Sequence, residues 1–459
     1  MSALITLSVL AIVVLYLGLY KAKNALLPVT LLGLAAVLGL SVMEWNSDAK
    51  PIYSGMMLFD NFAIAFTVIC VFSTMLILLI SRDYFERISE HVAEYYAIIL
   101  FSLVGIMVMV SYHNLSMLFI GIEIMSVSLY ILAGIRKKSM SSNEASLKYF
   151  LMGAFSTGFL LFGIALLYGA TGSFDLTVIK TYVIDNPTHI SPLFYSGLLL
   201  LIIGLCFKVG AAPFHFWVPD VYEGSPSLIT AYMITVVKTA GFAAFLRIFL
   251  ICFAPLHDFW MTPLLTITIV TLFIGNVSAL YQHSFKRMLA FSSISHAGYM
   301  LFAIVALGTA SINAVLLYAT AYSVASIIAF AVLIQVKRQI GSDHYESFNG
   351  LGRKNPFMAF TLTVAMLSLA GIPLTAGFIG KFVMFSSALS EYHVWLVVLA
   401  VINALIGFYY YLRVVVAMYF KDADHHAVVS TPLFSVVLAF SALVTIILGV
   451  YPGLISNLF

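Results

Sequence analysis

The sequence predicts an all-α membrane protein with about fourteen transmembrane helices. Of its 459 residues, 62% are apolar and only 9% are charged, and the mean hydropathy is +1.07. An ordinary soluble domain is nearer half apolar and a quarter charged, so no water-soluble fold could bury this much apolar surface. With about 20 residues for each crossing helix and about 10 for each connection, the length allows roughly fourteen or fifteen spans. These observations exclude a soluble enzyme.

Apolar segments of helical length give fourteen predicted spans in chain order. They cover 2–20, 25–43, 60–81, 95–112, 115–135, 147–170, 193–212, 227–250, 260–281, 287–308, 311–336, 356–390, 394–420 and 432–452. The first is interpreted as a retained helix, because a signal peptide has basic residues before its apolar run. Here the lysines, Lys21 and Lys23, come after it.

The distribution of basic residues predicts the orientation in the membrane. Loops after odd-numbered spans contain fourteen Lys and Arg residues, whereas only Lys50, Lys180 and Arg247 lie on the opposite side. Because loops rich in Lys and Arg stay in the cytoplasm, both termini are predicted to face away from it. The net charge is only +3 and no basic tail is present, so nucleic acid is not an expected partner.

The other five basic residues lie inside predicted spans, as does one carboxylate, Glu123. The five are Lys148, Lys208, Lys238, Lys381 and Arg413. A charge at the bilayer centre costs about 2.5–3.5 kcal/mol on insertion scales, so stability alone would favour leucine at such positions. These charges are therefore the main candidates for function.

Two interpretations of these charges stay open. Lys148 and Arg413 could extend toward the membrane surface from helix ends, and Glu123 with Lys208 could be a structural ion pair. The functional alternative is a proton relay, because burial lowers the pKa of a lysine and lets it exchange protons near neutral pH. An arginine cannot do so.

Two predicted spans contain breaks. The segment 207–217 reads FKVGAAPFHFW and the segment 370–382 reads AGIPLTAGFIGKF, and each combines small residues with a proline and a nearby lysine. Irregular backbone at membrane depth is tolerated where it is buried or lines a wet cavity, and matched breaks in two halves are typical of transporters. The sequence thus predicts discontinuous helices 7 and 12 within two inverted five-helix repeats, spans 4–8 and 9–13. The predicted divisions are 1–94, 95–252, 253–422 and 423–459.

Histidines and cysteines narrow the chemistry further. His215 and His296 lie in or next to predicted spans and could relay protons, although a hydrogen-bonded core histidine is an equal alternative. The three cysteines, Cys70, Cys206 and Cys252, are far apart, so an iron–sulfur cluster or zinc site is not expected.

Two further segments are not interpreted as ligand sites. The segment 377–382, GFIGKF, lacks both the glycine spacing of a phosphate loop and the hydroxyl after its lysine. The tail cluster of Asp422, Asp424, His425 and His426 is interpreted as a solvated loop, not as a metal site.

Four motifs together resemble the antiporter-like membrane subunits of respiratory complex I, the proton-pumping NADH:quinone oxidoreductase. They are FKVGAAPFHFWVPDVYEGSP at 207–226, GIE at 121–123, SSISHAGY at 292–299 and AGIPLTAGFIGKF at 370–382. The resemblance covers essentially the whole chain. The run from Pro219 to Pro226 is most similar to the subunit N group.

This resemblance implies a function and roles for particular residues. Glu123 and Lys208 would form a coupling pair, Lys238 the central relay and Lys381 the terminal lysine, with Lys148 and His296 in the same network. NADH, FMN, iron–sulfur clusters and quinone would bind other subunits, and this chain would bind no cofactor or metal.

The resemblance also implies partners and a location. The expected neighbours are lipid, the antiporter-like subunit M and the small subunits K, J and A, in a bacterial inner membrane. A free-standing cation/proton antiporter and a non-pumping scaffold are the alternatives. Sodium exchange would favour several carboxylates along the path, yet Glu123 is the only deep one.

Overall fold

The computed structural model describes the chain except for residues 21, 48–49, 86–90, 188, 309, 392–393, 423–427 and 459. Within the described residues every regular element is a helix, and β-pairing is limited to isolated bridges. The all-α prediction is therefore confirmed. Of the tail cluster, only Asp422 is described, and its other three members lie outside the described residues.

The chain forms two compact units. Unit one comprises Met1–Leu78, Arg82–Val209 and Val236–Leu264, and unit two comprises Leu79–Ser81, Gly210–Thr235 and Leu265–Phe459. The segment 210–235, which follows the predicted break in span 7, thus belongs to unit two.

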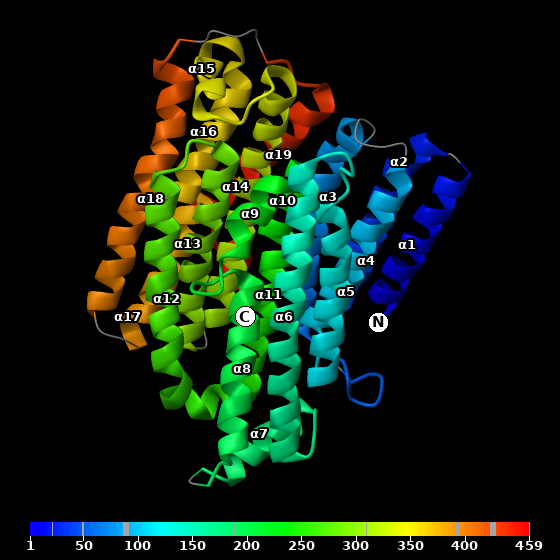
Figure 1. Ribbon diagram of the computed structural model, residues 1–459, viewed down its shortest axis with the longest axis vertical. Helices are drawn as coiled ribbons and strands as arrows, with labels where there is room; N and C mark the ends of the chain where they lie inside the picture. Colours follow the sequence, from blue (N-terminus) through cyan, green and yellow to red (C-terminus); the bar gives the residue numbers. More distant parts are fainter. Residues whose placement is uncertain are drawn as a thin grey trace. The chain divides into compact units, whose positions relative to one another are not determined.

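Unit one is built from long helices that pack as neighbours along the chain. Its helices are α1 (Ser2–Leu19), α2 (Lys23–Met43), most of α3 (Asn61–Phe85), α4 (Val92–Val110), α5 (Leu115–Ala133), α6 (Met140–Thr171), α7 (Leu176–Asp185), α8 (Pro192–Val209) and α11 (Lys238–Ile248). Figure 1 shows α4 beside α5 and α6 beside α8. A Cβ on Gly105 of α4 would lie 2.6 Å from the Met125 nitrogen of α5, so glycine allows these two helices to approach closely.

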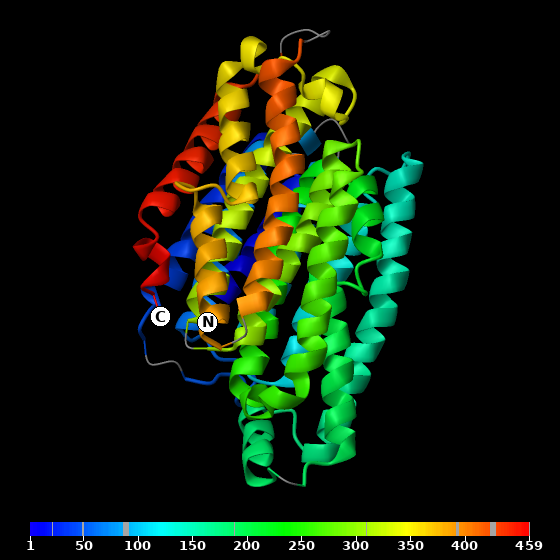
Figure 2. The same cartoon turned by 90° about the vertical axis from the view of Figure 1, so that its left-hand side faces the viewer.

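Unit two is centred on a helix that is buried along its length. Its elements are α9 (Trp217–Gly224), α10 (Ser227–Tyr232), most of α12 (His257–Leu280), α13 (Phe285–Ala306), α14 (Ser311–Ile340), α15 (Leu351–Lys354), α16 (Pro356–Ala370), α17 (Ala376–Glu391), α18 (Val394–Phe420), α19 (Pro432–Val450) and α20 (Gly453–Ser456). Helix α14 packs against α13, α16, α17 and α19. In Figure 2, α18 (orange) runs alongside α16.

Each predicted span coincides with helix. Twelve helices of the described residues are long and apolar enough to cross a membrane, which makes this a multi-pass membrane protein. One of the twelve, Ser227–Leu280, covers two predicted spans, and predicted span 12 consists of the shorter helices α16 and α17. The total of fourteen transmembrane helices and the presence of inverted repeats remain predictions. Helices α7 and α9 were not expected, because both are too short to register as spans.

Within each unit, every second loop lies at the same end of the helices, as expected of a chain that crosses the membrane repeatedly. In unit one, Met57 pairs with Tyr112 and Asn114 with Asp175, which joins the loops after the second, fourth and sixth predicted spans. In unit two, Ser284 pairs with His344, which joins the loops after the ninth and eleventh.

Candidate functional site

Lys208 of unit one lies in the last turn of α8 and is buried, with 8% of its surface exposed. Its ammonium donates a hydrogen bond to the Ser126 hydroxyl of α5. The helix ends one residue later, where Gly210 adopts a left-handed backbone with φ of +74°. A cation in the last turn of a helix is favoured by the unpaired carbonyls there, so the break helps to stabilise the charged lysine.

Glu123 lies one turn before Ser126 on α5. Its carboxylate acts electrostatically on Lys208, but the two form no ion pair within 4.0 Å. Its Oε1 atom is buried and has no hydrogen-bond partner. The predicted coupling pair is therefore close enough to interact and is not locked together.

Tyr130 is a further polar group next to this pair. It interacts electrostatically with Glu123 and also with the Ser126 side chain, although its buried hydroxyl makes no hydrogen bond of 3.5 Å or less. A Cβ on Gly153 of α6 would lie 2.1 Å from that hydroxyl oxygen, so the glycine makes room for it. Two neighbouring polar atoms thus lack partners in an apolar helix pair, a costly arrangement that is typical of functional sites.

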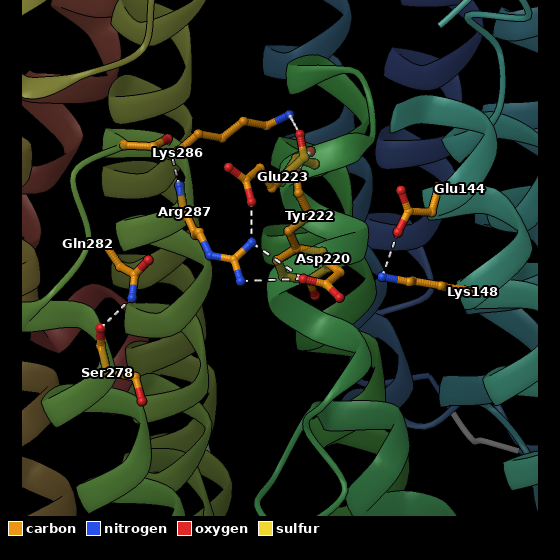
Figure 3. Close-up of polar contacts among 11 residues, drawn as sticks. Glu144, Lys148, Asp220, Tyr222, Glu223, Ser278, Gln282, Lys286 and Arg287 are labelled. Carbon is orange, nitrogen blue, oxygen red and sulfur yellow. Dashed lines mark hydrogen bonds and ion pairs between the residues drawn. The ribbon is translucent and has the colours of Figure 1, made fainter. Parts of the chain in front are cut away.

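Lys148 lies further from the start of its helix than predicted. Helix α6 begins at Met140, seven residues before the predicted span, and the Lys148 amine pairs with Glu144 at 2.7 Å. In the isolated chain the two side chains are 40% and 64% exposed. Figure 3 shows them paired, and Lys148 is the ninth residue of α6, about 12 Å from the start of that helix.

Lys238 is the most deeply buried lysine of unit one, with 3% exposure. It is the first residue of α11 and directly follows a π-helical turn, Met233–Val237. Such turns are rare and occur frequently at functional sites, because they re-aim the side chains that follow. No sequence pattern predicted this turn.

His296 of unit two is held by two tyrosine hydroxyls. Its Nδ1 lies 2.6 Å from the Tyr318 hydroxyl and its Nε2 lies 2.9 Å from the Tyr411 hydroxyl. The imidazole is 2% exposed and stacks on the Tyr322 ring at 4.5 Å. A neutral imidazole donates at one nitrogen and accepts at the other, so this arrangement links α13, α14 and α18 through one ring.

Lys381 of unit two lies on α17 and points back at the end of α16. Its amine donates to the carbonyl oxygens of Leu369 and Ala370, each at 3.0 Å, and lies 4.9 Å from the centre of the Tyr299 ring. It forms no ion pair with the described carboxylates. This buried ammonium is therefore stabilised by backbone dipoles and a ring, not by a counter-charge.

The break between α16 and α17 creates this site. Gly371 ends α16 in a left-handed conformation with φ of +86°, and a Cβ there would lie 2.9 Å from the Lys381 side chain. A Cβ on Gly377 would lie 1.9 Å from the Ser368 carbonyl oxygen. Glycine is thus required at both positions for Lys381 to reach the freed carbonyls. The predicted discontinuity of helix 12 is confirmed.

His215 follows the other break and belongs to unit two. It is 7% exposed and its Nδ1 atom has no hydrogen-bond partner. Its ring stacks on Phe216 at 4.8 Å. The structure therefore agrees with a buried polar group here and does not join it to the hydroxyls around His296.

A charged cluster at α9 and α13 was not predicted. The Arg287 guanidinium binds Asp220 at 3.3 Å and also Glu223, while the Lys286 amine donates to the Glu223 carbonyl oxygen at 2.9 Å (Figure 3). Lys286 also donates to the Ser225 carbonyl oxygen. These contacts cap the carboxyl end of α9 and fix it against α13.

Arg413 lies near the end of α18 and contacts loop residues of unit two. Its guanidinium lies 4.3 Å from the centre of the Tyr345 ring and donates to the Gln282 carbonyl oxygen at 3.4 Å. This placement agrees with the predicted alternative of a residue near a helix end. Among the described residues, no group of three or more His, Cys, Asp or Glu side chains could hold a metal ion.

The sequence matches the family described as NADH:quinone oxidoreductase/Mrp antiporter, transmembrane, over residues 111–407. A relative from Cytophaga hutchinsonii, NADH-quinone oxidoreductase subunit N, is 40% identical over all of this chain and 99% of its own length. This chain belongs to that family. Its subunit N members match it from end to end, so the resemblance seen in the sequence is confirmed.

Solved structures agree with this assignment. A chain of respiratory complex I from Thermus thermophilus with bound aureothin is 33% identical and has a TM-score of 0.85, covering 99% of this chain and 98% of that one. A chain of the Mrp complex from Dietzia sp. DQ12-45-1b is 17% identical, with a TM-score of 0.89 over 100% and 95% of the two chains. The Mrp match shows a shared fold alone.

Proposed function

We propose that this chain, as a membrane-arm subunit of NADH:quinone oxidoreductase, translocates protons through a relay of Glu123, Lys148, Lys208, Lys238, His296 and Lys381. The observation that carries the proposal is Lys381, a buried amine that is bound by carbonyls and a ring and has no ion-pair partner among the described residues. Such an amine can release its proton without leaving a carboxylate stranded in the apolar interior.

In the proposed sequence of steps, protons enter from the cytoplasmic side and pass by way of Lys238 and His296 to Lys381. A change in the Glu123–Lys208 interaction, driven by a neighbouring subunit, shifts the proton affinity of the lysines. Expulsion works against about 2.3 kcal/mol per charge for each 100 mV. A change of two or three units in the pKa of a buried lysine corresponds to about 3–4 kcal/mol, so the magnitudes are compatible.

The tyrosines around His296 add a specific step. When a proton reaches one ring nitrogen, the other nitrogen can pass its own proton to the facing hydroxyl as that hydroxyl releases its proton to the next acceptor, which reverses the tautomer. Because Tyr318 and Tyr411 occupy opposite nitrogens, the ring can carry a proton between α14 and α18 without a lasting charge.

The proposal extends to partners, cofactors and location. We infer that lipid, subunit M and the small subunits K, J and A surround the chain in a bacterial inner membrane, with both termini on the non-cytoplasmic side. NADH, FMN, iron–sulfur clusters and quinone would be bound by other subunits, and this chain would hold no redox centre.

The test uses the assembled oxidoreductase in proteoliposomes that carry Lys381→Ala or Lys238→Ala. NADH:quinone turnover and the proton gradient are measured together, with the exposed lysine substitution Lys354→Ala as the matched control. Both Ala variants should lose most of the gradient, and the control should lose none. An unchanged gradient and turnover in both would refute the relay and favour a non-pumping scaffold. A gradient that depends on sodium would instead favour cation/proton exchange.

A further inference from the structure

Arg247, near the end of α11 in unit one, is a buried arginine that the relay does not use. Only 2% of the residue is exposed, although arginine is among the residues least often fully buried. Its guanidinium binds the Asp60 carboxylate with two nearly parallel bonds, Nη1 to Oδ1 at 3.0 Å and Nη2 to Oδ2 at 3.1 Å. Two-pronged pairs of this kind are the strongest and most directional ion pairs.

Every remaining donor of the guanidinium is also occupied. Nε donates to the Tyr112 carbonyl oxygen at 2.9 Å, Nη1 to that of Val110 at 3.3 Å, and Nη2 to that of Leu58 at 3.5 Å. The five N–H groups of an arginine therefore all have acceptors in protein, and none is left for a water molecule. The guanidinium is therefore fully bonded within the protein.

The acceptors come from two segments, 58–60 and 110–112, that meet at one end of unit one. This is the end at which α4 finishes and at which α3 and α5 begin, here called the α4 end. Leu58 and Asp60 precede α3, Val110 is the last residue of α4, and Tyr112 leads toward α5. The Tyr112 hydroxyl donates to the Ala244 carbonyl oxygen of α11 at 2.9 Å, so Tyr112 binds α11 through both its main chain and its side chain.

An aromatic ring covers one face of the guanidinium. The Phe62 ring centre lies 5.3 Å from it, and Phe249, two residues after Arg247, packs on Trp260 with ring centres 4.7 Å apart. Phe249 and Trp260 are fully buried. Within this end of unit one, a proton would have to cross an apolar layer that contains a fixed cation.

The spacing from Lys238 explains why this matters to the relay. Arg247 follows Lys238 by nine residues, about 13 Å along a helix, and Thr239 is the only polar side chain in 239–246. An arginine does not release its proton in proteins, so it cannot serve as the next step. Its partner Asp60 is 31% exposed, whereas Arg247 is 2% exposed. A proton that moved outward from the interior would therefore meet the Arg247 cation before the Asp60 carboxylate.

We propose that Arg247, held by Asp60, seals unit one at the α4 end against protons, and that this keeps Lys238 from exchanging protons with that side of the membrane. The inference rests on the proposed function, because a seal matters only where a proton path exists. Arg247 acts here as a positioning and sealing residue and takes no part in proton transfer.

The experiment compares proteoliposomes of the assembled oxidoreductase with Arg247→Gln, Asp60→Asn and the control Arg413→Gln. Passive proton uptake is measured without NADH, and then the proton gradient formed per NADH oxidised. Arg247→Gln should raise passive uptake and lower the gradient per NADH at least three-fold, with NADH:quinone turnover within two-fold of the unsubstituted enzyme. Asp60→Asn should act in the same direction more weakly, and Arg413→Gln should change neither readout.

Unchanged passive uptake and an unchanged gradient in Arg247→Gln would overturn the seal. If Arg247→Gln does not assemble, Asp60→Asn decides in the same way. Failure of both to assemble would show that the network serves folding alone, which also overturns the proposal. A leak in Arg247→Gln combined with normal pumping in Lys238→Ala would disprove the relay while leaving the seal in place, so the two failures are distinguishable.

Discussion

The two buried lysines at helix breaks, Lys208 in unit one and Lys381 in unit two, are held by different kinds of partner. Lys208 is bound by a side-chain hydroxyl and influenced by a carboxylate, whereas Lys381 is bound by two main-chain carbonyls. Side chains can rotate and change protonation, but carbonyls at a helix end are fixed. The comparison suggests that unit one carries the adjustable site and unit two the constant one.

The largest effect is expected where the constant site loses its ability to deprotonate. Lys381→Arg keeps the positive charge but cannot release it, so proton pumping should fall about ten-fold or more, because one pKa unit already corresponds to about 1.4 kcal/mol. The measurement is the proton gradient formed by assembled complex in proteoliposomes. Pumping at the normal rate by Lys381→Arg would mean that this site contributes only a fixed charge.

A smaller effect is expected at the adjustable site. Glu123→Gln removes the charge that acts on Lys208 but leaves its size, so coupled turnover should fall about five-fold, which is in the usual range of coupling between sites. Ser126→Ala serves as the companion variant, because it removes the hydroxyl and leaves the carboxylate. If Ser126→Ala were as damaging as Glu123→Gln, the hydrogen bond and not the charge would control Lys208.

The histidine of unit two offers a matched set of tyrosines. Tyr318→Phe and Tyr411→Phe each remove one hydroxyl from His296, and a single hydrogen bond contributes about 0.5–1.5 kcal/mol net, so pumping should fall roughly three-fold. Tyr322→Phe is the control, since that ring stacks on the imidazole and its hydroxyl is not bound to it. Equal losses in all three variants would show that packing alone is being measured.

The smallest effect is expected at Asp343, outside both sites. Burial alone would raise the pKa of this carboxyl, but the Lys337 ammonium, helped by Ser284 and Lys286, holds it below its ordinary value. The carboxylate therefore contributes stability above about pH 4, and this contribution is lost as the pH falls through its lowered pKa. Asp343→Asn should destabilise the complex by about 0.5–1 kcal/mol at neutral pH, with pumping unchanged.

Thermal unfolding of the purified complex at several pH values checks this prediction. The difference between Asp343→Asn and the unsubstituted complex should shrink as the pH is lowered toward 4 and below. A difference that grows on acidification would have the wrong sign for a carboxylate with a lowered pKa. Because the change leaves both relay sites untouched, it also calibrates how much instability alone affects the gradient.

The sequence predicted the lysines well because a charge inside an apolar segment stands out. Lys208, Lys238 and Lys381 are all buried in the structure, and the break beside Lys381 follows from Gly371 and its neighbouring proline. Whether these residues relay protons stays a prediction. The helical segments were also predictable, since the apolar runs are long and the turns between them are polar.

The partners of these residues could not be predicted in the same way. Tyr318 and Tyr411 are two of 25 tyrosines and lie 22 and 115 positions from His296, so no local pattern connects them. Ser126 is one of many small polar residues on helices. Lys148 was expected at the start of its span but lies about two turns into α6, because the polar first turns hid the true start of that helix. Such contacts depend on which helices become neighbours, and composition does not encode this.

The bonds of Arg247 also have a consequence for how the chain is made. Its acceptors, from Leu58 to Tyr112, are all synthesised before it. When α11 is inserted into the membrane, the Asp60 carboxylate and the main-chain carbonyl acceptors are already present and can bind the Arg247 guanidinium. The order of synthesis therefore makes the acceptors of Arg247 before Arg247 itself. A circular permutation that placed α11 ahead of α3 would leave the guanidinium without these acceptors during membrane insertion.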